Sequence, residues 1–172
     1  IDHYNPRPKD YHGAKSGNTD LFISLKGKNG KWGKPINLGH HINTPYSERS
    51  PFLHPDMKTL YFSSDGYGGM GKLDVYKSTR LDDSWTNWST PVNLGKYINT
   101  PYDDWGYKIT ADGKKAFFAF TPDRFESSDL YEVQLPGAFG ADEVVTIRGT
   151  ILNKNGGAVS ADIIWEDMDT GL

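Results

Sequence analysis

The chain contains no cysteine, which excludes disulfides, cysteine-ligated zinc and thiol catalysis. A cysteine-free chain suits a reducing and an oxidising compartment equally, so this absence leaves the compartment open. No apolar stretch is long enough to span a membrane as a helix. The 19 lysine and arginine residues are balanced by 22 aspartate and glutamate residues without a long basic run, so we expect no nucleic-acid partner.

Helical periodicity is missing as well, because apolar residues do not recur at spacings of three and four. Glycine, proline, asparagine and aspartate instead interrupt the chain at short intervals. This pattern is typical of many short β-strands joined by tight turns. The chain opens on Ile1 in mid-pattern without a signal peptide, and we therefore expect the natural N-terminus to lie upstream.

A long internal repeat is the strongest pattern that the sequence does contain. The segment WGKPINLGHHINTPY, which begins at Trp32, returns 56 residues later as WSTPVNLGKYINTPY, which begins at Trp88, with ten of the fifteen positions identical. The same register aligns residues 59–63 with residues 115–119. The chain therefore holds about two and a half copies of one structural unit.

The complete unit is expected to contain four antiparallel strands, predicted at residues 50–54, 59–65, 73–80 and 91–95. Four strands per repeat predict the blades of a β-propeller, so the expected fold class is all-β. Alternate connections of such a sheet emerge on the same side. One face should therefore carry residues 40–49, 65–72, 96–105 and 121–128, and the opposite face residues 26–34 and 81–89.

The pattern changes near Ala141, and we predict a domain boundary there. Residues 1–140 are expected to form the C-terminal blades of the propeller, and residues 141–172 the start of a small, truncated β-sandwich. In the second part, strands are predicted at residues 144–152 and 161–167, joined by a turn at residues 155–157. About thirty residues cannot bury an independent core.

Two motifs suggest ligands but have structural explanations. Gly66, Gly68 and Gly71 match the spacing of a phosphate-binding glycine motif, yet the residues that follow predict a strand and not the helix that such a site needs. His40 and His41 suggest a metal site, but adjacent side chains of an extended segment point to opposite sides, and the repeat replaces both. We therefore expect a glycine-rich loop, and surface histidines without a metal.

The paired acids Asp103 and Asp104 could hydrolyse glycosides if a second carboxylate faced them across a sugar. The preceding copy carries Ser47 and Glu48 instead, and no matching partner stands out. Solvated loop acids are an alternative explanation. So is a structural role in which Glu48 and Asp104 accept hydrogen bonds from neighbouring backbone amides.

The aromatic residues divide into two groups. Those in predicted strands occupy equivalent positions of the repeat, so they should pack one sheet against the next; they are Phe22, Tyr61, Phe62, Tyr76, Phe117, Phe118 and Tyr131. A second group falls in loops of one face, where exposed aromatic side chains among mixed charges suit a peptide or protein partner. Its members are Tyr46, Tyr67, Tyr102 and Trp105.

Residues 50–80, SPFLHPDMKTLYFSSDGYGGMGKLDVYKSTR, resemble the TolB-like, WD-type propeller repeat. Its usual form is Ser-Pro-Asp-Gly-Lys, an aromatic strand, Ser-Asp, Gly-Gly and Asp-Leu-Tyr. The chain departs from it at His54, where the family has serine, and at Met57, where the family has glycine. The resemblance covers residues 20–135. The segment from Val144 is similar to the opening of a carboxypeptidase-regulatory-like domain.

This domain order resembles OmpA-family envelope proteins of bacteria that have a type IX secretion or gliding apparatus. The resemblance implies a periplasmic, outer-membrane-associated lipoprotein that binds other envelope or secretion-apparatus proteins. It also implies peptidoglycan binding through a C-terminal domain absent from this chain. We expect a non-catalytic docking module with no cofactor, no metal and no membrane span of its own.

The expected partner-binding surface lies on the first of the two loop faces. Its residues are His40, His41, Tyr46, Tyr67, Tyr102, Asp103, Asp104 and Trp105. Two alternatives stay open at this point. The chain could be an accessory, substrate-gating propeller of a serine peptidase, because the TolB-like repeat also precedes such domains. It could also be a glycan-binding propeller.

Overall fold

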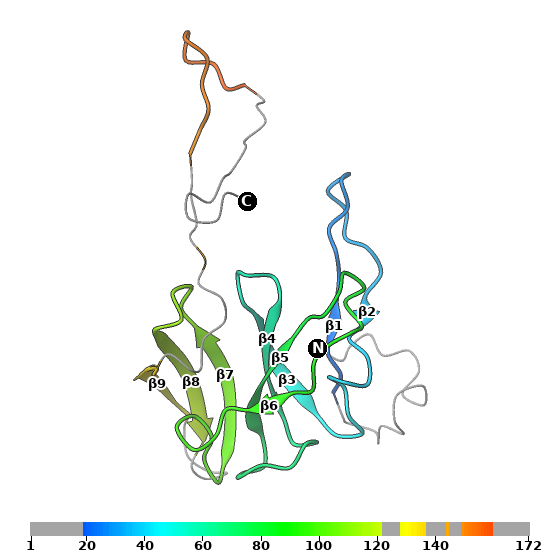
Figure 1. Ribbon diagram of the computed structural model, residues 1–172, viewed down its shortest axis with the longest axis vertical. Helices are drawn as coiled ribbons and strands as arrows, with labels where there is room; N and C mark the ends of the chain where they lie inside the picture. Colours follow the sequence, from blue (N-terminus) through cyan, green and yellow to red (C-terminus); the bar gives the residue numbers. More distant parts are fainter. Residues whose placement is uncertain (1–18, 122–127, 137–143, 145–148, 160–172) are drawn as a thin grey trace.

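The computed structural model describes residues 19–121, 128–136, 144 and 149–159, and in them the chain forms three open antiparallel sheets (Figure 1). The first sheet pairs β1 (Phe22–Ile23) with β2 (Ile36–Asn37). The second has the order β3 (Glu48–Leu53), β4 (Thr59–Ser64), β5 (Asp74–Thr79), β6 (Val92–Asn93). The third has the order β7 (Asp103–Ile109), β8 (Lys115–Thr121), β9 (Asp129–Gln134).

The described residues contain no helix, so the expected all-β class is confirmed. It follows that no helix in this part of the chain is long and apolar enough to cross a membrane. The four strands predicted for the central unit are all present in the predicted order, and each is antiparallel to its neighbour.

The sequence repeat reappears in the strand pairing. Tyr76 of β5 lies opposite Asn93 of β6, and Phe22 of β1 lies opposite Asn37 of β2. The first strands of the second and third sheets, β3 and β7, also match, because both contain a β-bulge near their start. The bulge includes Ser50 (φ 49°) in the second sheet and Gly106 (φ 71°), its equivalent, in the third.

Two hydrophobic cores separate the sheets. The first core lies between the first and second sheets and consists of Leu21, Leu38, Ile42, Leu60, Phe62, Tyr76, Trp85 and Trp88. The second core lies between the second and third sheets and consists of Tyr61, Val75, Leu94, Ile98, Tyr107, Ile109, Ala116 and Phe118. Strand β4 is buried on both sides, because successive side chains alternate between the two cores. The expected packing of strand aromatics between neighbouring sheets is thus confirmed for Tyr61, Phe62, Tyr76 and Phe118.

A tight turn, of the kind expected between the short strands, joins β3 to β4. The side chain of Asp56 accepts hydrogen bonds from the backbone amides of Lys58 and Thr59, both at 2.8 Å. His54, which stands where the resembling repeat has serine, accepts the amide of Asp56 through Nδ1 at 3.2 Å. The imidazole therefore serves the turn as a hydrogen-bond acceptor. Met57 adopts φ 59° where the equivalent Gly113 adopts φ 67°.

The segment after the third sheet is described only in part. Asn153 and Gly157 close a short turn through a 2.9 Å backbone hydrogen bond, and Leu152 bridges Ala158. The turn predicted near residues 155–157 is therefore confirmed. The strand predicted at residues 161–167 lies outside the described residues, as does part of the one at 144–152, and the proposed domain boundary stays a prediction.

Candidate functional site

Two connections lead from the last strand of one sheet to the first strand of the next, and we call them the first link (residues 38–47) and the second link (residues 94–102). Both contact the loop at residues 65–72. The amide of Ser47 donates to Asp65 at 2.7 Å, and the amide of Lys72 donates to the carbonyl of Tyr102 at 3.1 Å. The links and this loop thus meet at one end of the sheets, as predicted (Figure 1). We call this end the loop face.

An asparagine anchors each link to the sheet that it leaves. Asn99 accepts the amide of Val75 at 2.7 Å and donates to the carbonyl of Val75 at 3.0 Å. Asn43 makes the same pair of hydrogen bonds with Leu21, at 2.7 and 3.0 Å. Each side chain also contacts the asparagine of the adjacent outer strand. Asn43 and Asn99, the clamp asparagines, therefore complete the edge of a sheet with a side chain in place of backbone.

A carboxylate holds the far end of each link. Glu48 accepts the amide of Thr44 at 3.0 Å and the hydroxyl groups of Thr44 and Ser64 at 2.6 and 2.8 Å. Asp104 accepts the amide of Thr100 at 2.6 Å. This confirms the structural explanation for both acids, and the solvated one is wrong because both are 0% exposed.

Burial strongly affects the titration of these two acids. It raises the pKa of Glu48 from 4.5 to about 7, against the opposing effect of the hydrogen bonds from Thr44 and Ser64. It raises the pKa of Asp104 from 3.8 to about 6, against the hydrogen bonds from Thr100. Such values would suit general acid-base catalysis. Both side chains, however, are enclosed and use their oxygens within the links, so we assign them to the architecture of the loop face.

The other predicted site residues differ in accessibility. His40, Tyr46, Tyr102 and Trp105 are exposed, whereas His41, Tyr67 and Asp103 are half-buried. The hydroxyl of Tyr67 lies 2.6 Å from the carbonyl of Ile42, and its ring packs on the first core. Burial raises the pKa of Tyr67 above its usual range. Tyr67 and Asp104 thus hold the loop face together from inside.

The histidine pair differs from the sequence-based expectation. The rings of His40 and His41 lie side by side, with centroids 4.2 Å apart, because these residues occupy a turn and not an extended segment. Within the described part of the chain, no group of three or more histidine, cysteine, aspartate or glutamate side chains could hold a metal ion. The pair therefore forms a small imidazole surface on the first link.

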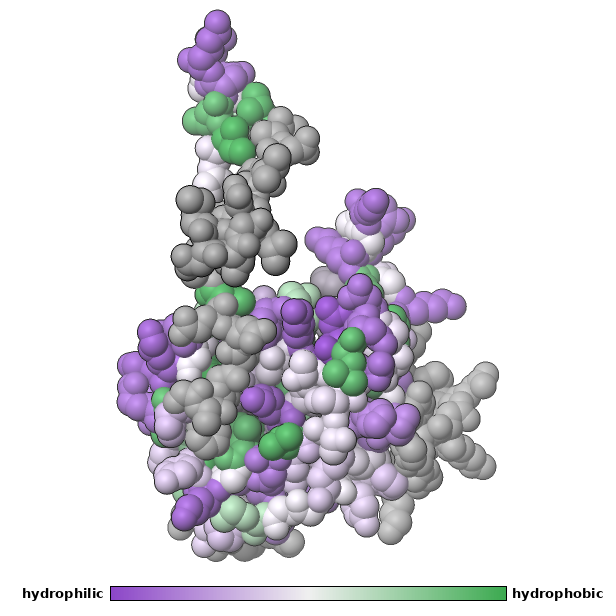
Figure 2. All heavy atoms as spheres, viewed as in Figure 1, coloured by the Kyte–Doolittle hydropathy of each residue, from purple (hydrophilic) through white to green (hydrophobic). Residues whose placement is uncertain are grey.

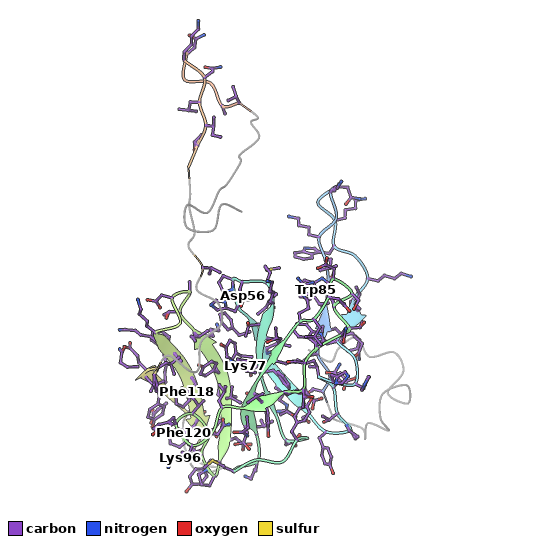
Figure 3. The ribbon with its side chains drawn as sticks, in the orientation of Figure 1. Asp56, Lys77, Trp85, Lys96, Phe118 and Phe120 are labelled. Carbon is purple, nitrogen blue, oxygen red and sulfur yellow. The ribbon has the colours of Figure 1, made fainter. Side chains whose placement is uncertain are left out.

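Asp103 and Trp105 were expected in a loop but belong to strand β7. Asp103 lies 3.9 Å from the amine of Lys72, which comes from the neighbouring loop. The ring of Tyr102 contacts Phe120, which in turn contacts Tyr131. Figure 3 shows Phe118 and Phe120 along the third sheet and Lys96 at its lower end. An aromatic row thus runs from the second link onto the third sheet.

Sequence reasoning missed two exposed residues of the loop face. Tyr97 on the second link is 67% exposed, and Met70 on the adjoining loop is 47% exposed. Tyr97 occupies the position of His41 in the second copy of the repeat. This substitution is the signal that could have identified it, because a residue that differs between copies of a repeat is not required for the fold.

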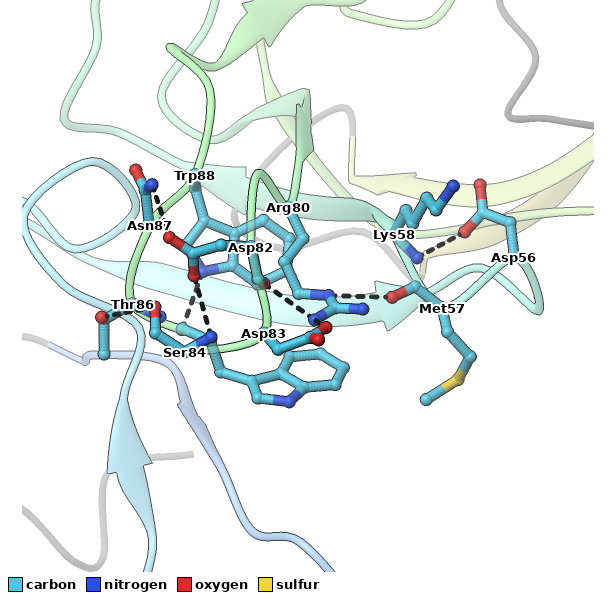
Figure 4. A network of polar contacts seen from close by, with 11 residues as sticks. Asp56, Met57, Lys58, Arg80, Asp82, Asp83, Ser84, Thr86, Asn87 and Trp88 are labelled. Atoms are coloured by element: carbon cyan, nitrogen blue, oxygen red, sulfur yellow. Dashed lines mark hydrogen bonds and ion pairs between the residues drawn. The ribbon is translucent and has the colours of Figure 1, made fainter.

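The opposite end of the sheets carries a polar network around Arg80 (Figure 4). Its guanidinium donates to the carbonyls of Met57 and Asp82 and to the carboxylate of Asp83. It also lies over the ring of Trp85, 4.4 Å from the centroid. Trp85 is buried although its backbone has φ 64°. The network therefore holds a strained tryptophan in the first core, which is a structural role.

An apolar cavity of about 270 Å³ lies beside this tryptophan, between the first and second sheets. Its walls include Pro51, Leu53, Trp85 and Trp88, and no titratable side chain lines it. The position of Pro51 is taken in the third sheet by Tyr107, whose ring packs on Tyr61 in the second core. The cavity thus reflects a smaller side chain at an equivalent position, and it lacks the polar groups that catalysis requires.

The loop face is therefore the best candidate site, because it combines exposed aromatic rings with charged side chains on a rigid base. It presents side chains that can recognise a partner, and its two buried carboxylates stabilise the links that carry them. Comparison of the chain with protein-family models, curated proteins and solved structures found no match.

Proposed function

We propose that the three sheets are consecutive blades of a β-propeller and that the chain is a non-catalytic docking module. Support for the propeller comes from the repeated strand order and from links that lead from the outermost strand of one sheet to the innermost strand of the next. The two similar inter-sheet cores, which share strand β4, provide further support. Propellers suit docking because rigid sheets fix loops whose chemistry is free to vary.

The observation that best supports this proposal comes from comparing the two links: buried residues are identical in both, whereas the residues at the tip of the turn differ. The buried residues Leu38, Ile42 and Asn43 return unchanged as Leu94, Ile98 and Asn99. The two residues at the tip of the turn between them differ, with His40 and His41 in one copy and Lys96 and Tyr97 in the other. The buried framework of the links is thus the same in both copies, and so are the exposed Tyr46 and Tyr102, while the chemistry at the tip of the turn differs. This is the pattern expected of a scaffold that presents recognition groups.

The exposed groups on the loop face suit a protein partner. Tyr46, Tyr97 and Tyr102 are 55%, 67% and 45% exposed, and each ring offers apolar area with a polar tip. Lysine and aspartate side chains surround them, as at Lys72 and Asp103. Figure 2 shows apolar atoms of the sheets in small separate groups on the visible side. The exposed groups of the loop face itself suit contacts through aromatic rings with a charged rim.

The proposed partners are other proteins of a bacterial envelope or secretion apparatus, and the proposed location is the periplasm at the outer membrane. Both rest on the resemblance to the TolB-like repeat and on the domain order that follows it. Peptidoglycan contact is proposed only for a domain that this chain does not contain.

Site-specific photo-crosslinking tests the proposed surface. A photo-reactive phenylalanine analogue placed at Tyr46 or Tyr102 of the parent protein, in its native envelope, should capture the same partner from both positions. Trp32 provides the matched control, because it is a 69% exposed aromatic residue on the hairpin of the opposite end. If Trp32 captures that partner equally well, or if neither tyrosine captures any protein, the loop face is not the docking surface.

A further inference from the structure

The hairpin at residues 25–34, which joins β1 to β2, carries positive charge only. Its four lysines are Lys26, Lys28, Lys31 and Lys34. No aspartate or glutamate occurs between Asp20 and Glu48, a stretch that includes the whole hairpin. The chain has a net charge of −3, so all residues other than these four lysines together carry −7. The hairpin is thus a local concentration of positive charge on an otherwise acidic chain.

Hydrogen bonds give this hairpin a defined shape. The amide of Gly27 donates to the carbonyl of Lys31 at 2.8 Å, and the amide of Gly33 donates to the carbonyl of Leu25 at 2.8 Å. The side chain of Asn29 closes the turn by accepting the amide of Lys31 at 3.0 Å. The hairpin extends beyond the sheets at the end opposite the loop face (Figure 1), and its tip is hydrophilic (Figure 2). The lysines therefore belong to an ordered projection of the molecule.

The four lysines are accessible to a partner. Each is exposed, and none forms an ion pair with a carboxylate in the part of the chain that the structure describes. The second sheet packs on both of its sides, and the tip of its corresponding hairpin is still exposed at Asp82, Asp83 and Asn87. Exposure at the tip is therefore a property of this position in the repeat. The two copies present opposite charge there, because the second carries aspartates.

The composition of the hairpin favours an anionic lipid surface over other anionic partners. Protein interfaces depend on buried aromatic residues and arginine, whereas the turn at residues 27–31 contains only glycine, lysine and asparagine. A nucleic acid requires a basic stripe along the protein, whereas here the positive charge is confined to one projection from an acidic chain. Lysine acts as a point charge, and each lysine near an anionic bilayer adds to the attraction without a specific geometry.

We propose that the hairpin at residues 25–34 docks on the surface of a bilayer that contains anionic phospholipids. Its ammonium groups lie among the lipid phosphates. The acidic remainder of the chain lies farther from the bilayer, where dissolved salt screens its repulsion. Because the hairpin and the loop face lie at opposite ends of the sheets, a chain bound in this way presents the loop face away from the bilayer (Figure 1). This inference goes beyond the proposed function and does not depend on it.

Co-sedimentation of the whole chain with lipid vesicles tests the proposal. Vesicles of phosphatidylcholine with about one third phosphatidylglycerol should bind the chain, vesicles of phosphatidylcholine alone should not, and added salt should release it. The double variant Lys28→Gln, Lys31→Gln should bind the anionic vesicles about thirtyfold more weakly, because two of the four charges are lost. The matched control Lys72→Gln, Lys96→Gln removes the same charge from exposed lysines of the loop face and should bind like the wild type.

Several outcomes would overturn the proposal, with thermal melting used to verify that both double variants are folded. They are equal binding to the two kinds of vesicle, equal loss of binding in the two double variants, and no binding to anionic vesicles. A short double-stranded DNA at the same phosphate concentration tests the other polyanion. If it binds more tightly than the vesicles and loses affinity in Lys28→Gln, Lys31→Gln, the hairpin binds a nucleic acid and the proposal is wrong.

Discussion

At the residue scale, three of the described residues other than glycine adopt positive φ, and they divide into two kinds. Ser50 and Met57 have glycines, Gly106 and Gly113, at the equivalent positions of the next copy. The backbone shape there is thus set by the bulge and the turn, and the residue tolerates it. Trp85 instead has cation–π and core contacts that hold it in place. Only at the first two positions should glycine relieve strain.

Replacing Met57 by glycine is therefore predicted to stabilise the protein. The side chain is 51% exposed, so little packing is lost, and the left-handed backbone costs an ordinary residue about 1 kcal/mol. We expect Met57→Gly to raise the free energy of unfolding by roughly 1 kcal/mol and the melting temperature by about 2–4 °C. Differential scanning calorimetry measures both.

The reverse substitution in the next copy provides the control. Gly113→Ala should lower the melting temperature by a similar amount, because Gly113 has φ 67°. A destabilised Met57→Gly variant would mean that the methionine side chain contributes contacts that outweigh the strain.

At the element scale, the two links depend on buried carboxylates, which makes their stability sensitive to pH. The folded-state pKa of Glu48 is about 7 against 4.5 in the unfolded chain, so the folded state binds the proton more tightly. The resulting stabilisation is fully present below pH 4.5 and is lost as the pH rises through about 7. Asp104 adds the same trend between pH 3.8 and about 6.

The free energy of unfolding should therefore fall as the pH rises from 4.5 to about 7. In Glu48→Gln this fall should be smaller, since glutamine cannot ionise. Its oxygen can still accept the amide of Thr44, and its NH2 group can donate to the hydroxyl oxygens of Thr44 and Ser64. Urea unfolding followed by tryptophan fluorescence across this range measures the effect. Glu132→Gln, an exposed acid paired with Lys115, should leave the slope unchanged. Equal slopes in wild type and Glu48→Gln would show that Glu48 does not titrate in this window.

Elements of the fold were largely predictable, and the exceptions have physical causes. The second strand of the central unit was predicted at residues 59–65 and ends at Ser64, because its apolar run and flanking turns are local signals. The start of β7 at Asp103 was not predictable, because the residues that pair with β8 there are polar. The bulge at Gly106 also interrupts the alternation of inward and outward side chains along the strand.

The candidate site was predictable only in part. The grouping of residues 40–49, 65–72 and 96–105 on one face followed from strand order and is confirmed, whereas the fourth predicted segment, residues 121–128, lies largely outside the described residues. Asp104 was predicted as a partner-binding residue, but the alternative of a hydrogen bond from a backbone amide also followed from the sequence and is the correct one. The partial burial of Tyr67 was missed, because it depends on a hydrogen bond to the carbonyl of Ile42, which is distant in the sequence. The clamp asparagines were also missed, since an asparagine that recurs in the loops of both copies is typical of a turn.

At the scale of the whole molecule, strand β4 couples three sheets through two cores. Leu60→Ala and Tyr61→Ala change neighbouring residues on opposite sides of this strand. Each should cost roughly 2–5 kcal/mol of stability. Leu60→Ala should speed amide exchange preferentially in β1, β2 and residues 81–88, whereas Tyr61→Ala should do so in β7 and β8. Hydrogen exchange with mass spectrometry separates the two patterns.

The two variants serve as controls for each other, because they share one strand and lie on opposite sides of it. If both variants loosen all three sheets equally, the molecule unfolds as one cooperative unit and the two cores are not independent.

The clamp asparagines place the boundary of the repeated unit inside the connections between sheets. Each sheet is finished by a side chain that belongs to the segment leading into the following sheet. During evolution, a gain or loss of 56 residues can therefore begin at any point of the unit, since each interaction is restored one copy further along. The number of sheets in such a protein can thus change in a single recombination event, without a new interface having to arise.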